Sequence, residues 1–92
     1  MPKPRLSSLT QADLKALSRV EFGLAWEMLV HVSRNPGEGK IVLPMQYEMD
    51  PTLHRPCTEY TRLFKAPRRA TIYYEAQAGE LHVYRIVSYD VL

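Results

Sequence analysis

Three β-prone segments joined by short connections constrain this chain more than any other feature. TIYYEA (71–76) and ELHVYRIVSY (80–89) are rich in β-branched and aromatic residues, and Gly79 between them suits a hairpin turn. YTRLFK (60–65) precedes them, and Pro67 presets a turn dihedral in the connection. Strands connected this tightly run antiparallel to their neighbours. We therefore expect an antiparallel sheet with one face that needs a cover.

Two helix-start signals near the N-terminus indicate what the cover is. Each pairs a hydroxyl residue with an acid three positions later, Thr10 with Asp13 and Ser18 with Glu21, as in a capping box. Apolar residues follow helical spacing from about Arg19 to Arg34. The two signals predict a helical hairpin rather than one long helix.

The segment RNPGEGK (34–40) ends the second helix, because proline and glycine do not continue it. KIVLPM (40–45) is typical of an edge strand limited by Pro44, and QYEMDPTLHRPC (46–57) is predicted to be a loop. The expected architecture is a two-layer α+β domain over residues 1–92. A helical hairpin over 9–35 packs on a three- to four-stranded antiparallel sheet over 40–92.

The composition is that of an ordinary globular protein, with 46% hydrophobic and 24% charged residues in a chain of 92. Its net charge of +2 is too small to indicate a nucleic-acid binder by itself. Cys57 is the single cysteine, so no internal disulfide can form. Without a transmembrane-length apolar run or a secretory signal, we expect a cytoplasmic protein that does not bind membranes.

Basic and aromatic side chains interleave in the segment that precedes the last two strands. Between residues 55 and 69 there are five basic residues and one acid, Glu59. Arginine pairs with phosphate and aromatic rings stack on bases, so this cluster is typical of a nucleic-acid surface. The alternative is a solvated sheet face whose aromatic residues belong to the core. Strand register decides between the two interpretations.

Other candidate sites are weaker. His82 alternates with Leu81 and Val83, and is either a proton-transfer group or a histidine on the solvent face. His54 and Cys57 supply half of a metal site, whereas a closed zinc site needs four ligands. We expect no metal and no other cofactor.

The order of elements and the strand motif around ATIYYEA and LHVYRIV resemble the RelE/ParE superfamily of bacterial toxins over about residues 9–87. The resemblance implies two N-terminal helices packed on a twisted antiparallel sheet, with a first strand for which KPRLSSL is the candidate. RelE-like members are ribosome-dependent ribonucleases, and ParE-like members poison DNA gyrase. The implied partners are RNA and the ribosome or a nucleic-acid-processing enzyme, together with a small antitoxin protein.

The resemblance also implies site residues. Tyr73 matches the closing tyrosine of the family's strand motif, whereas Ala70 occupies the place of its arginine, directly after Arg68 and Arg69. The candidate catalytic residues are Arg68, Arg69, Tyr74, His82 and Tyr89. The candidate residues for binding nucleic acid or a partner are Arg55, Arg62, Lys65, Arg68, Arg69, Tyr60 and Tyr73.

Two functions remain open. One is a ribosome-dependent mRNA endonuclease that needs no metal, in which basic residues stabilise the phosphate and lower the pKa of a neighbouring tyrosine or histidine. The other is a small non-catalytic inhibitor, of phage or plasmid type, that blocks a host nucleic-acid enzyme or ribonucleoprotein through arginine and tyrosine contacts. The low net charge disfavours a plain nucleic-acid-binding module.

Overall fold

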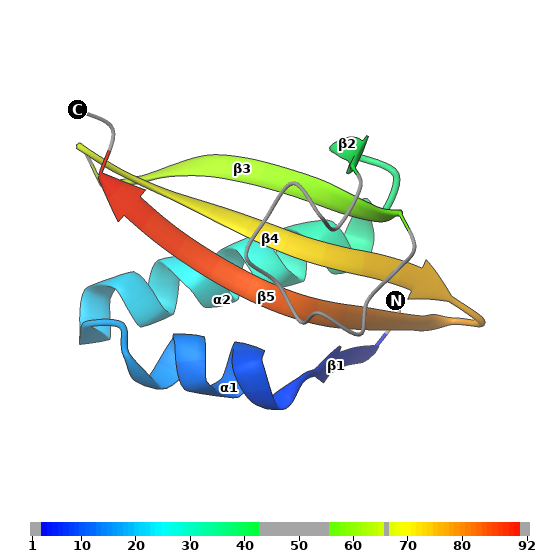
Figure 1. Cartoon of the computed structure of the whole chain (residues 1–92), viewed down its shortest axis with the longest axis horizontal. Coiled ribbons are helices and arrows are strands. Elements are labelled where there is room, and N and C mark those ends of the chain that lie inside the picture. The colour runs from blue at the N-terminus through cyan, green and yellow to red at the C-terminus, as the bar shows by residue number, and fades with distance from the viewer. Residues whose placement is uncertain (1–2, 43–55, 66, 91–92) are drawn as a thin grey trace.

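The computed structural model describes residues 3–42, 56–65 and 67–90 and shows a sheet with both helices on one side (Figure 1). The elements in chain order are β1 (Lys3–Leu6), α1 (Ser8–Lys15), α2 (Arg19–Arg34), β2 (Lys40–Val42), β3 (Cys57–Lys65), β4 (Arg68–Gln77) and β5 (Glu80–Asp90). The architecture is therefore two-layer α+β. Neither helix is long and apolar enough to cross a membrane.

The sheet has five strands in the order β1-β5-β4-β3-β2. β1 runs parallel to β5, and the other neighbours are antiparallel. The expectation of three to four strands, all antiparallel, is wrong in both count and direction. β1 has only four residues and contains Pro4, so it carries little local strand signal. It forms at the sheet edge, paired with a strand almost at the other end of the chain.

The helices begin at two serine caps. Ser18 accepts a hydrogen bond from the Glu21 backbone N–H at 3.2 Å, which confirms the second capping signal. The first expectation is wrong, because α1 begins at Ser8 and Ser7 is its N-cap, accepting from the Thr10 N–H at 3.0 Å. β2 covers the first part of the expected edge strand. The rest of that strand, residues 43–45, and residues 46–55 of the expected loop lie outside the described residues, and Cys57, expected at the end of the loop, is the first residue of β3.

The main core lies between α2 and the inner face of the sheet, and Leu14 of α1 joins it. α2 buries Ala25, Met28, Leu29 and Val32 on one stripe. Helical spacing alone also places Phe22 and Trp26 on the apolar face with Ala25, Leu29 and Val32, and that part of the prediction is wrong, because both rings are exposed. The strands contribute alternate residues to the same cluster: Phe64, Ala70, Ile72, Tyr74, Leu81, Val83 and Ile86. This alternation defines the inner face, which is turned toward the helices, and an outer face, which is turned away from them.

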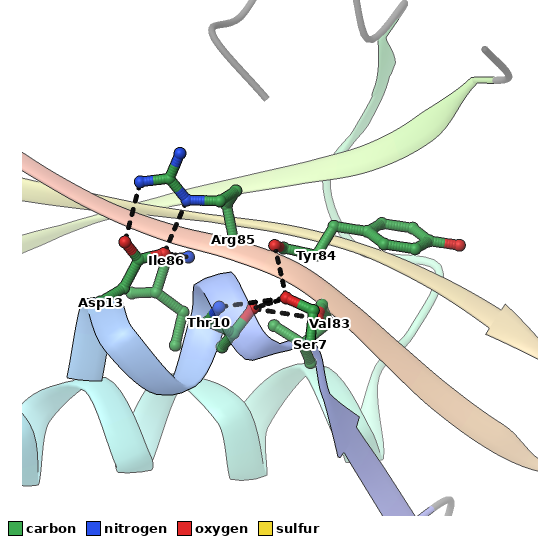
Figure 2. A network of polar contacts seen from close by, with 7 residues as sticks. All are labelled: Ser7, Thr10, Asp13, Val83, Tyr84, Arg85 and Ile86. Carbon is green, nitrogen blue, oxygen red and sulfur yellow. Dashed lines mark hydrogen bonds and ion pairs between the residues drawn. The ribbon is translucent and has the colours of Figure 1, made fainter. Parts of the chain in front are cut away.

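α1 takes over the edge of β5 where β1 ends (Figure 2). The Ser7 N–H and the Thr10 hydroxyl both donate to the Val83 carbonyl, at 3.1 and 3.0 Å, and the Ser7 hydroxyl donates to the Tyr84 carbonyl at 2.9 Å. Thr10 is fully buried. The Thr10 hydroxyl, which the sequence placed at a helix cap, is therefore a second donor to a strand carbonyl that already accepts from the Ser7 N–H.

Asp13 completes this contact one helical turn later (Figure 2). Its Oδ2 accepts from the Ile86 backbone N–H at 3.0 Å and from Arg85 Nε at 2.8 Å, and its Oδ1 accepts from Arg85 Nη2 at 2.8 Å. Its hydrogen bonds raise the pKa of Arg85 above the ordinary value. The two side chains are only 14% and 24% exposed, so this bidentate pair is shielded from water.

We expect Asp13→Ala to lower the free energy of unfolding by about 2–3 kcal/mol, because it leaves both the Arg85 guanidinium and the Ile86 N–H without their acceptor. Urea denaturation measures the loss. Glu27→Ala, which removes an exposed acid from α2, is the matched control and should change stability by less than about 0.5 kcal/mol. Equal stability of the two variants would contradict the role given to Asp13.

Candidate nucleic-acid interface

Strand register splits the predicted basic cluster between the two faces of the sheet. Ala70, Ile72 and Tyr74 of β4 lie in the core, so Arg69 and Tyr73, at alternating positions, lie on the outer face. The predicted set therefore does not form one surface.

Three exposed side chains lie side by side on the outer face at one end of the sheet. Arg69 of β4 is directly opposite Leu63 of β3 on one side and Tyr89 of β5 on the other. Leu63 is 60% exposed, Tyr89 is 42% exposed, and Arg69 is also exposed. Directly opposed residues have Cβ atoms about 4.5–5.5 Å apart. This Arg69 row (Leu63, Arg69 and Tyr89) presents a cation, a phenol and an apolar side chain to one ligand.

Arg68 points to the other face and has a structural role. Its Nε lies 2.8 Å from Glu21 Oε2 at the start of α2, and its Nη2 donates to Ser88 Oγ at 2.7 Å. Glu21 is largely buried in this pair, with a side chain only 15% exposed. Arg68 thus ties the first turn of α2 to the end of the sheet. One residue of register separates this anchor from the exposed Arg69.

Tyr74 is fully buried on the inner face. Its hydroxyl donates its single proton between the carbonyls of Pro36 and Glu38, at 2.9 and 2.6 Å. Burial, followed by the Glu38 carboxylate, raises the pKa of Tyr74 to about 12. The Tyr74 hydroxyl therefore stabilises the turn after α2. It lies on the opposite face of the sheet from the Arg69 row, so it cannot act together with Arg69.

The remaining predicted binding residues are also divided. Tyr60 packs against the core and stacks on His31 of α2, with ring centroids 5.3 Å apart. Arg62 is exposed but is paired with the inner-face position Ala70. Tyr73 lies on the outer face and is only 6% exposed. Arg55 and the side chain of Lys65 lie outside the described residues.

A β-bulge in β5 determines which of its residues reach the outer face. Tyr73 pairs with Arg85 while Tyr74 pairs with Val83, so Tyr84 is the extra residue. Simple alternation would place Arg85 with Val83 in the core. The bulge instead turns Arg85 outward and puts Tyr89 on the same face as His82. Arg85 was missed at the sequence level, and its signal is the break in period between Val83 and Ile86, both of which are buried.

His82 lies on the outer face at the end opposite the Arg69 row. It pairs with Arg5 of β1, and its Nε2 lies 3.2 Å from Glu80 Oε2. Six residues of β5 lie between it and Tyr89, which puts the two side chains roughly 20 Å apart at the rise of a strand. His82 and Tyr89 therefore cannot act on one phosphodiester bond.

Cys57 is buried, and burial followed by Glu75 and Glu59 raises its pKa to about 11. The thiol is therefore protonated at neutral pH and is not a nucleophile there. No group of three or more His, Cys, Asp or Glu residues is placed to hold a metal ion within the described parts of the chain. His54, the other half of the considered metal site, lies outside them.

No protein-family model matches the chain, and neither the curated proteins nor the solved structures contain a significant match to it. The function is therefore inferred from the placement of the chain's own residues.

We expect Tyr74→Phe to lower the free energy of unfolding by about 1–2 kcal/mol near neutral pH, because the partly buried carbonyls of Pro36 and Glu38 lose their donor. The folded pKa of about 12 exceeds the ordinary value of 10.0, so the unfolded chain ionises first. The advantage of the native tyrosine is complete below about pH 10 and shrinks between about pH 10 and 12. Denaturation of both proteins across this range measures it.

Tyr89→Phe is the control, because that hydroxyl is on an exposed side chain. A stability difference between native protein and Tyr74→Phe that stayed constant up to about pH 12 would contradict the assigned environment of Tyr74.

Proposed function

We propose that the protein is a small toxin-type protein of the RelE kind, which binds messenger RNA on the outer face of its sheet and cleaves it. The observation that carries the proposal is that Arg69 of β4 and Tyr89 of β5 lie directly opposite each other and that both side chains are exposed. The arrangement of β1, the two helices and the three long strands supports the proposal, because the RelE/ParE resemblance includes a strand before the helical hairpin.

Cleavage of a phosphodiester bond by the neighbouring 2′-hydroxyl needs a proton acceptor, a proton donor and a cation. The ribose 2′-oxygen forms a bond to phosphorus and gives its proton to a base, while the bond from phosphorus to the 5′-oxygen breaks and that oxygen takes up a proton. A cation stabilises the charge that gathers on the phosphate oxygens. Arg69 supplies the cation, and Tyr89 donates its hydroxyl proton to the departing 5′-oxygen. Water takes the proton of the 2′-hydroxyl and returns one to Tyr89, and Leu63 offers an apolar contact for a nucleobase or ribose.

We expect Arg69→Ala and Tyr89→Phe each to reduce cleavage by roughly 10²-fold or more, because the first removes the cation and the second removes the proton donor. The measurement is a cell-free translation reaction containing substoichiometric protein, with cuts mapped along the message. Arg62→Ala is the matched control, since it removes an exposed arginine whose register position belongs to the inner face. Undiminished cleavage by Arg69→Ala would exclude this site.

A second candidate function is inhibition by protein binding, and it is favoured by an exposed aromatic pair on α2. Phe22 and Trp26 lie one helical turn apart and stack with ring centroids 6.4 Å apart and an interplanar angle of 6°. They are 45% and 47% exposed. Tryptophan is among the residues that most often dominate binding energy, and two exposed stacked rings form a ready anchor for a protein partner.

If inhibition is the function, translation stops only at stoichiometric protein, the message stays intact, and Trp26→Ala weakens inhibition by roughly 30-fold or more. Val20→Ala is the control, because Val20 is 62% exposed on the same helix but lies outside the stacked pair. Mapped cuts at substoichiometric protein, together with full activity of Trp26→Ala, would reject this candidate.

A further inference from the structure

A hollow of about 500 Å³ lies beside the parallel pair of β1 and β5, at the end of the sheet far from the Arg69 row. It is lined by Arg5 and Leu6 of β1, by Ser7, and by His82, Val83 and Tyr84 of β5. The register places Arg5 directly beside His82. The hollow therefore joins a permanent cation to a side chain that can carry a second positive charge.

One carboxylate oxygen already contacts both groups. Glu80 Oε2 lies 3.5 Å from Arg5 Nε and 3.2 Å from His82 Nε2. The Arg5 side chain is 66% exposed and that of Glu80 is 41% exposed, so water screens the Arg5–Glu80 pair. Arg5 has five N–H donors, of which this contact uses one at long range. An incoming phosphate offers arginine a stronger bidentate contact than Glu80 does.

We propose that this hollow is a second anion subsite, which holds a phosphate of the RNA strand that reaches the Arg69 row, and that Glu80 competes with this phosphate. The inference rests on the proposed function. It adds the class of substrate, a single strand of RNA long enough to cover both ends of β5.

The outer row of β5 supports a continuous path between the two ends. Tyr84 and Arg85 lie between His82 and Tyr89 on the same face, and all four side chains are at least partly exposed. The Arg85 guanidinium is held by Asp13, so the contact that this stretch offers to RNA is the ring of Tyr84. Aromatic rings hold a single strand without reading its sequence. The separation of roughly 20 Å corresponds to about six nucleotides at the rise of about 3.4 Å of a stacked strand.

The test uses 2′-O-methyl RNA, which lacks the nucleophilic hydroxyl and so reports binding alone. Strands of about three and about nine nucleotides cover one end of β5 or both, respectively. Arg5→Ala should weaken binding of the longer strand by roughly tenfold and leave the shorter strand, bound at the Arg69 row, unchanged. Glu80→Gln, which removes the competing charge at constant shape, should strengthen binding of the longer strand several-fold. Arg19→Ala, an exposed arginine on α2, is the control.

Equal binding of the longer strand by the native protein and Arg5→Ala would overturn the subsite. Unchanged or weaker binding by Glu80→Gln would overturn the competition. Inorganic pyrophosphate is a separate probe, because its binding does not depend on the Arg69 row. One outcome separates the two proposals. If Arg5→Ala and Glu80→Gln change the affinity for pyrophosphate while Arg69→Ala changes the affinity for neither RNA strand, the anion subsite stands and the proposed function fails. If pyrophosphate responds to neither change, the subsite fails.

Discussion

The edge of β5 is the constraint on which the rest of the structure depends. β5 is the longest strand, with eleven residues, but its neighbour β1 covers only residues 80–83 of it. An uncovered edge leaves carbonyl and N–H groups without partners and invites pairing with other chains. Ser7, Thr10 and Asp13 satisfy the next part of that edge from α1. A short helix with little apolar surface is thereby fixed to the sheet by polar contacts rather than by packing alone.

The same contact is coupled to the bulge that shapes the outer face. Asp13 binds the Ile86 N–H and the Arg85 side chain, directly after the extra residue Tyr84. The bulge reverses the alternation of β5, so that Ile86 enters the core and Arg85 and Tyr89 turn outward. The composition of the candidate RNA surface is thus a consequence of how α1 holds the strand. A change in α1 can therefore alter the outer face without touching it.

The sequence predicted correctly those elements whose signals lie within the element itself. The cap at Ser18, the length of α2 and the three long strands with their tight connections follow from residues close together in sequence. β1 could not be found this way, because its pairing partners lie at the other end of the chain, with Lys3 beside Glu80 and Leu6 beside Val83. The division of Arg68 and Arg69 between two faces also escaped prediction, because both were placed in the connection before the strand TIYYEA, whereas β4 already begins at Arg68. The candidate catalytic set was consequently reduced to one arginine and one tyrosine at the Arg69 row.

With only one arginine and one tyrosine at the Arg69 row, an RNA ligand needs contacts elsewhere on the protein. A single arginine beside a tyrosine holds one phosphate weakly, so an RNA-directed function needs further contacts along the strand, and β5 offers them toward Arg5. The aromatic pair of α2 belongs to the helical layer, whereas the Arg69 row faces away from it. Distant sites with no shared partners contribute independently to binding. Occupation of α2 by a protein therefore leaves the outer face open, and loss of function at one surface can be assigned without reference to the other.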